Sequence, residues 1–206
     1  MSYADGIAAI NLEMPDRVPR TEYSVHRHWK LINHILGTNI SEQSTKEEQQ
    51  QASSAFTKEW NYDFMWNTLT HRQIFKGKST SMGHAVYEQG GVDLNKDVHT
   101  FLDDPDDILS FDPWEVFGAI DKKAATKEYN DHIDLQNKNY DDLVNTTGVY
   151  VTCISGLIEL FGWEMLLLAA GIDSKQFGEV ANRYTNWILQ YFEALADSKA
   201  PVIMVH

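Results

Sequence analysis

Two apolar runs near the end of the chain, with a long helical segment between them, constrain the fold most. The runs GVYVTCISG (148–156) and APVIMVH (200–206) have the β-branched, apolar composition of strands buried on both faces. Between them lie an apolar helical pattern over 162–171 and an amphipathic one over 173–199. Because a connection of this length is too long for a hairpin, the pattern predicts parallel strands linked by helices.

The same alternation extends toward the N-terminus. Strand patterns cover 18–25 and 61–66, and the glycine-rich stretch 76–96 is typical of a β-hairpin or a loop that covers a substrate. Helices are predicted over 1–14, 26–37, 44–60 and just after Asp104 and Asp112, where Pro105 and Pro113 favour helix starts. We therefore expect a parallel α/β architecture that forms one domain over residues 1–206.

Composition narrows the possible partners and compartment. The net charge of −13 repels nucleic acid and anionic membrane surfaces, and we expect neither as a partner. The N-terminus has neither a basic segment nor a sustained apolar run, as a leader peptide would. The single cysteine, Cys153, excludes an internal disulfide framework and is expected to be a buried, inert thiol within a strand. These features favour a cytoplasmic protein.

Polar side chains gather where the predicted strands end, which is where α/β proteins bind ligands. The common nucleotide, zinc and nucleophile motifs are absent from the sequence. Histidines at such places can act as acid, base or metal ligand, although His26 and His28 are more often surface or core-edge residues than a two-histidine metal clip. Asp63, between two aromatic residues, is a capping carboxylate or a catalytic one with a raised pKa. The candidates are His26, Arg27, His28, Asp63, Asn67, Ser155, Gly156 and His206.

Several stretches resemble the uroporphyrinogen decarboxylase superfamily, which includes the decarboxylases and the corrinoid-linked methyltransferases. DRVPRTEYSVHRHW is similar to the first strand and loop of that family, and EWNYDFMW is similar to its second strand. The long stretch from GVYVTCISG to APVIMVH is similar to a strand, turn, long helix and following strand. The resemblance implies a (β/α) TIM barrel of eight strands, of which this chain supplies the first half or slightly more.

The resemblance also implies roles for individual residues. Asp63 lies near the position of the acidic residue that holds the tetrapyrrole, and Trp66 and Asn67 follow it. The arginine-rich loop of the decarboxylases is replaced by His26, Arg27 and His28, so that Arg27 alone could take over the binding of substrate carboxylates. Taken together, the strand-end positions and the resemblance predict catalysis by Asp63, His26 and His206, and substrate binding by Arg27, His28, Trp66, Asn67, Ser155 and Gly156.

The expected function is that of an enzyme acting on a tetrapyrrole (porphyrin) or corrinoid-linked substrate. In the lyase branch it decarboxylates without a cofactor. In the methyltransferase branch it exchanges methyl groups with a corrinoid protein, using zinc held by residues of later barrel strands that lie outside this chain. We expect the 206-residue fragment to be inactive alone and to be either a homo-oligomer or lacking its C-terminal half. The alternative is a non-catalytic half barrel that dimerises or completes a partner chain.

Overall fold

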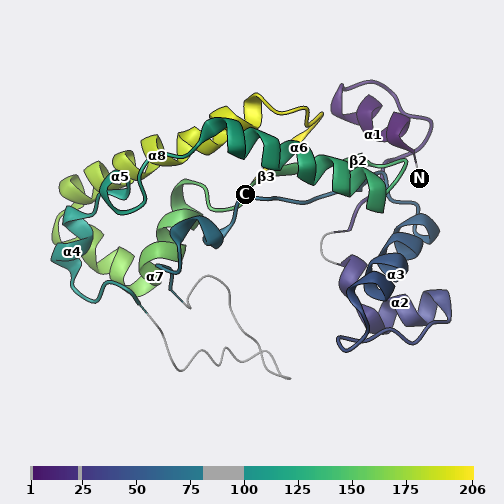
Figure 1. Cartoon of the computed structure of the whole chain (residues 1–206), viewed down its shortest axis with the longest axis horizontal. Coiled ribbons are helices and arrows are strands. Elements are labelled where there is room, and N and C mark those ends of the chain that lie inside the picture. Colours follow the sequence, from purple (N-terminus) through teal and green to yellow (C-terminus); the bar gives the residue numbers. More distant parts are fainter. Residues whose placement is uncertain (1, 23–24, 81–99) are drawn as a thin grey trace. The chain divides into compact units, whose positions relative to one another are not determined.

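The computed structural model describes residues 2–22, 25–80 and 100–206, and the chain folds into two compact units. Unit 1 comprises Met1–Asn67, Glu128–Thr147 and Lys199–Met204, and unit 2 comprises Thr68–Lys127, Gly148–Ser198 and Val205–His206. The architecture is mixed α/β and mostly helical, with a few short parallel strands (Figure 1). The strands of the described residues form no closed barrel.

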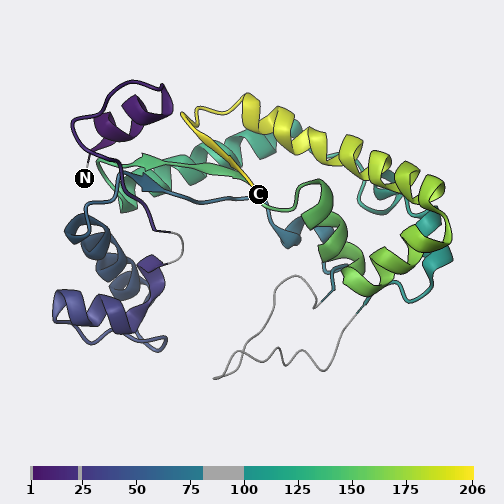
Figure 2. The ribbon, with the colours of Figure 1, turned by 180° about the vertical axis from the view of Figure 1, so that it is seen from behind.

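Unit 1 is built from helices around one short parallel pair of strands. Phe64 of β1 pairs with Val144 of β2 in parallel register. Helices α2 and α3 lie side by side in both views (Figures 1 and 2) and pack on this pair through a common apolar core. The elements are α1 (Tyr3–Ile10), the 3-10 helix η1 (Val25–Arg27), α2 (Trp29–Leu36), α3 (Lys46–Glu59), β1 (Phe64–Met65) and β2 (Val144–Asn145). The core residues are Ile32, Ala52, Phe56, Tyr62, Met65, Tyr140 and Leu143.

Local sequence signals place the helix ends of unit 1. The Thr45 hydroxyl accepts a hydrogen bond from Glu48 N at 3.2 Å, while the Glu48 carboxylate accepts one from Thr45 N at 2.8 Å. This capping box satisfies donors that the first turn of α3 would otherwise leave unpaired. Gly37 ends α2 in the left-handed conformation, with φ 66°, which glycine adopts without steric cost. The helices predicted over 26–37 and 44–60 are thus confirmed.

Unit 2 has an aromatic core between its helices. The predicted helix starts at Pro105 and Pro113 are confirmed, because Asp104 and Asp112 cap the two helices. The core rings belong to Phe75, Phe111, Phe117, Phe161, Tyr184 and Trp187. The elements are η2 (Arg72–Phe75), α4 (Pro105–Ser110), α5 (Pro113–Val116), α7 (Cys153–Ile172) and α8 (Ser174–Ala196). The division between the units falls within α6 (Lys122–Asn139), β3 (Thr147–Val149) and β4 (Ile203–Val205).

The prediction of a strand over 148–156 is wrong for most of its length. Strand β3 ends at Val149 and α7 begins at Cys153, because Thr152 and Ser155 form a capping box there. Cys153 is therefore an exposed helical residue, not a buried strand residue. A short apolar run does not distinguish a buried strand from the start of a buried helix, which explains the error.

Other predicted elements differ in extent or burial. Residues 18–22 form no strand, and the strand expected over 61–66 is reduced to β1. The pattern over 200–206 does form β4, but Ile203 and Val205 are exposed, so the strand is not buried on both faces. Residues 81–99, which hold most of the expected hairpin, lie outside the described residues.

Helix α7 is the one helix in the described ranges that is long and apolar enough to cross a membrane. Half of its most apolar window is buried within the protein, as is common for core helices of soluble proteins. The helix is interrupted at Gly162, where φ is 74° and ψ is 164°. Length and composition alone therefore do not identify it as a membrane span.

Candidate functional site

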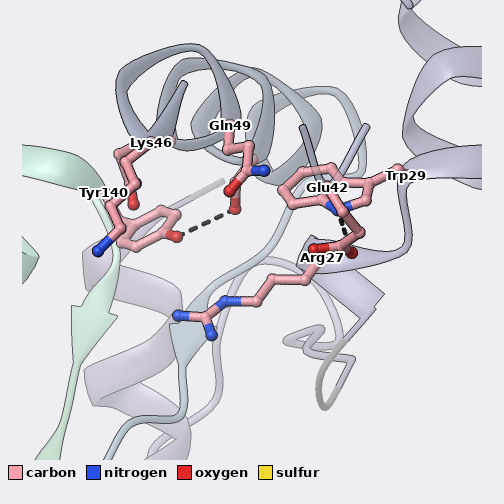
Figure 3. Close-up of a pocket in the computed structure, with 8 residues that line it drawn as sticks. Arg27, Trp29, Glu42, Lys46, Gln49 and Tyr140 are labelled. Atoms are coloured by element: carbon pink, nitrogen blue, oxygen red, sulfur yellow. Dashed lines mark hydrogen bonds between the residues drawn. The ribbon is translucent and has the colours of Figure 1, made fainter. Parts of the chain in front are cut away.

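The described part of unit 1 contains a pocket of about 390 Å³ between η1, α2, α3 and Tyr140 (Figure 3). Its polar lining combines basic, acidic, amide and hydroxyl groups with one indole ring. The lining residues are Arg27, Trp29, Glu42, Lys46, Gln49, Gln50, Ser53 and Tyr140.

Helix α3 supplies half of this lining from one face. Gln49, Gln50 and Ser53 lie three, four and seven residues after Lys46, offsets that place side chains on the same side of a helix. Ser53 is buried, and its hydroxyl lies 3.0 Å from that of Tyr140, a residue 87 positions later in the chain. The hydrogen bond between these hydroxyls fixes one wall of the pocket.

The pocket lining contains positive charges and a hydrogen-bond donor that form no ion pair or hydrogen bond with other described residues. Neither the Arg27 guanidinium nor the Lys46 ammonium forms an ion pair or a side-chain hydrogen bond within the described ranges. The Gln50 Nε2 atom is buried and has no hydrogen-bond acceptor among the described residues. A buried donor without an acceptor costs about 1–3 kcal/mol, so an acceptor group bound here would be stabilised. The arrangement suits an anionic group.

The acidic member of the lining has one defined partner. Trp29 Nε1 donates a hydrogen bond of 2.7 Å to Glu42 Oε1. In Figure 3 this pair lies on one side of the pocket, and the Arg27 side chain extends to the other side, toward Tyr140. The pocket therefore has groups of opposite charge on its two sides.

His26 is buried and contacts Tyr140, a residue of the pocket lining. Burial, with a smaller contribution from the neighbouring Arg27 charge, lowers the pKa of His26 to about 4. The imidazole is therefore neutral at pH 7. Its ring packs edge-on against the Tyr140 ring, with the two centroids 6.3 Å apart. A neutral, buried ring cannot donate a proton as an imidazolium acid at that pH.

His28 is exposed, and its side chain caps the helix that follows it. Its Nδ1 accepts a hydrogen bond of 3.2 Å from Leu31 N and thereby caps α2. No group of three or more His, Cys, Asp or Glu side chains within the described ranges is arranged to hold a metal ion. The zinc ligands that the methyltransferase resemblance implies belong to later barrel strands outside this chain, so they are not among these residues.

Asp63 is fully buried and its carboxylate is occupied by the N-terminal segment. It accepts hydrogen bonds of 2.8 Å from Ser2 N and from Arg20 N, and it is paired with the Arg17 guanidinium. Three donors thus compensate the buried charge. In this arrangement the carboxylate anchors residues 2–20, and a tetrapyrrole would have to displace these partners to reach it.

The two residues that follow β1 are also engaged. The Trp66 ring stacks on Phe64 with centroids 5.1 Å apart. Asn67 Nδ2 donates to Gln136 Oε1 at 3.0 Å, and Gln136 Nε2 lies 3.0 Å from His132 Nε2. Neither Trp66 nor Asn67 belongs to the lining of the Arg27 pocket.

The remaining predicted site residues lie in unit 2. The His206 ring stacks on Tyr150 with ring centroids 4.1 Å apart, and Tyr150 stacks on His71 with centroids 5.1 Å apart. The Ser155 hydroxyl donates to Tyr150 O at 2.9 Å. The structure thus brings Ser155 and His206 close to the same tyrosine.

Gly156 is buried in α7 and is a packing residue. A Cβ atom added there would lie 1.8 Å from the Tyr184 hydroxyl oxygen. The absence of a side chain at Gly156 therefore makes room for Tyr184, not for a substrate.

Of the nine predicted site residues, only Arg27 lines the described pocket. The polar helix pattern of 44–60 was a signal for Lys46 and Gln50, because their spacing places them on one face. Tyr140 and Glu42 reach the pocket through packing, and no local pattern marks them.

Comparisons of the chain with protein-family models, with curated proteins and with solved structures found no match. The structure itself defines a mixed α/β protein with a pocket that is lined by charged groups and an indole ring and suits an anionic group.

Proposed function

We propose that this chain forms the N-terminal part of an enzyme similar to the uroporphyrinogen decarboxylase superfamily, which acts on a tetrapyrrole or corrinoid-linked substrate. Its parallel strands would then belong to an incomplete TIM-like barrel. The observation that carries the proposal is the unpaired Arg27 guanidinium at the pocket, in the segment that stands in place of the arginine-rich loop of the decarboxylases. A cytoplasmic location and a corrinoid protein partner are parts of the same proposal.

The engagement of Asp63 favours the methyltransferase branch over the decarboxylase branch. In decarboxylation, a carboxylate near the substrate stabilises the positive charge of a protonated pyrrole while CO₂ leaves. Asp63 is buried beneath Ser2, Arg17 and Arg20, so its charge is already compensated. Methyl transfer makes no demand on this carboxylate.

The proposal is tested by titrating the protein with uroporphyrin and following porphyrin fluorescence. Arg27→Ala is expected to weaken binding at least about tenfold, because it removes the guanidinium that pairs with a substrate carboxylate. Lys30→Ala is the matched control, since Lys30 is an exposed cation outside the pocket lining. Equal affinities of the two variants, or no binding by the unmodified protein, would overturn the proposal.

A second candidate function is that of a non-catalytic half barrel that pairs with another copy of itself. Exposed apolar side chains on α7 favour it, because the faces of helices that are not covered are usually polar. These are Trp163, Leu167, Leu168 and Ile172. Light scattering coupled to size exclusion tests this candidate: a dimer that Leu167→Asp dissociates supports it, and a monomeric unmodified protein rejects it.

A further inference from the structure

We infer that the pocket of unit 1 binds a small zwitterion, a carboxylate joined to a methylated ammonium group, with the carboxylate at Arg27 and the ammonium at Glu42 and Trp29. This ligand class goes beyond the proposed function, because a tetrapyrrole presents carboxylates without a balancing cation. The inference shares the pocket with that proposal but does not depend on its chemistry.

The carboxylate end is defined by Arg27, and the lining holds two further donors without acceptors among the described residues. Arg27 and Lys46 contribute two positive charges that no described carboxylate neutralises, and Gln50 Nε2 contributes a buried N–H group. A guanidinium presents two parallel N–H groups, which match the two oxygens of a carboxylate. The buried Nε2 atom of Gln50, also in the lining, is a further donor for an oxygen of the ligand.

The ammonium end is defined by Glu42 and Trp29. The hydrogen bond from Trp29 Nε1 occupies Glu42 Oε1, and Glu42 Oε2 receives no hydrogen bond from the described residues. The carboxylate therefore keeps its negative charge on the side of the pocket opposite the Arg27 guanidinium, as Figure 3 shows. An indole ring is the aromatic group that attracts cations most strongly.

The chemistry of this end favours a methylated ammonium over a primary one. A primary ammonium has three N–H donors that need acceptors, and Glu42 is the acidic side chain in the pocket lining. A quaternary ammonium has no N–H group, so one carboxylate and one aromatic ring are sufficient partners. The pocket volume of about 390 Å³ also suits a small ligand.

The charge at Glu42 argues against a simple anion as the ligand. An anion that fills the pocket places negative charge near the Glu42 carboxylate, which repels it. A positive group at that end of the ligand is instead attracted by the Glu42 carboxylate. The pocket thus discriminates between two molecules of the same shape that differ only in this charge.

The experiment is calorimetric titration of the full chain with three probes. Glycine betaine carries both charges, 3,3-dimethylbutyrate has the same shape without the positive charge, and choline lacks the carboxylate. We expect glycine betaine to bind at least about tenfold more tightly than either of the others. Equal binding of betaine and 3,3-dimethylbutyrate, or no binding of betaine, would overturn the inference.

Two variants, each with a matched control, test which residue binds each end of the ligand. Arg27→Met is expected to weaken betaine binding about tenfold, and Glu42→Gln is expected to do the same while strengthening binding of 3,3-dimethylbutyrate. Lys30→Met and Glu47→Gln remove exposed charges outside the pocket lining and should leave both affinities unchanged. A Glu42→Gln protein that keeps the betaine selectivity contradicts the assignment.

The porphyrin titration run in parallel separates this inference from the proposed function. Betaine binding without porphyrin binding supports the zwitterion site and rejects the tetrapyrrole substrate. Porphyrin binding without betaine binding rejects the zwitterion site alone.

Discussion

The Tyr184 hydroxyl occupies the space that a side chain on Gly156 would need. An added Cβ at Gly156 lies 1.8 Å from this oxygen, and the hydroxyl donates a hydrogen bond of 2.8 Å to Val151 O. The contact ties α7 to α8 inside unit 2. Gly156, predicted to bind substrate from its place at a predicted strand end, therefore contributes to stability in this structure.

Gly156→Ala is expected to destabilise the protein by about 2–4 kcal/mol, because the Tyr184 hydroxyl must move and lose its acceptor. Gly178→Ala is the control, since no atom lies within 4 Å of its added Cβ and alanine favours the helix by up to about 1 kcal/mol. Urea unfolding, monitored by circular dichroism, measures the free energy of unfolding of both variants. A Gly156→Ala protein as stable as the unmodified one would contradict this packing.

Protonation of His26 is expected to destabilise the folded protein at mildly acidic pH. The pKa of His26 is about 4 in the folded protein, whereas the ordinary pKa of histidine, which applies to the unfolded chain, is 6.5. The unfolded chain therefore binds more protons in this range, and stability is lost as pH falls from 6.5 toward 4, by up to about 3 kcal/mol.

The check is the free energy of unfolding against pH for the unmodified protein and for His26→Leu. The slope between pH 6.5 and 4 should be smaller in the variant, because the titrating group is gone. His34→Ala serves as control, since His34 is exposed and does not cap a helix. A His26 imidazole that titrates near 6.5 by NMR would refute the prediction.

Asp63→Asn is expected to destabilise unit 1 by about 3–5 kcal/mol, because it leaves the Arg17 charge without its buried partner. The exposed pair of Lys58 and Asp141, 2.7 Å apart, is the comparison. Asp141→Asn should cost less than about 1 kcal/mol, since solvent screens exposed ion pairs. Thermal unfolding distinguishes the two; similar losses would show that Asp63 is not an anchor.

The capping box at the start of α3 predicts a pH-dependent contribution from Glu48. Hydrogen bonds from Thr45 N and then from the Thr45 hydroxyl lower the pKa of Glu48 below its usual value. The stability that this carboxylate contributes is therefore present above its unfolded pKa and is lost as pH falls through the lower folded value. Glu48→Gln should be less stable than the unmodified protein at pH 7 and equally stable near pH 2. A difference that persists unchanged at low pH would exclude the carboxylate as its source.

The sequence alone determined the helices whose ends are marked by local chemistry. Thr45 with Glu48, Gly37 and the prolines at 105 and 113 act through hydrogen bonds or backbone geometry within a few residues, so their effects can be derived from neighbouring positions. The mixed α/β class followed from the same local patterns.

Only the tertiary structure decided where the short strands pair and where the pocket lies. Strands of two or three residues are too short to show a periodic pattern, so Val144 of β2 could not be recognised as a partner of Phe64. The same holds for Tyr140, which reaches Ser53 across 87 residues because both pack on the core of unit 1. Arg27 could be identified from the sequence, but its charged and aromatic surroundings arise from packing between distant segments, which no local pattern records.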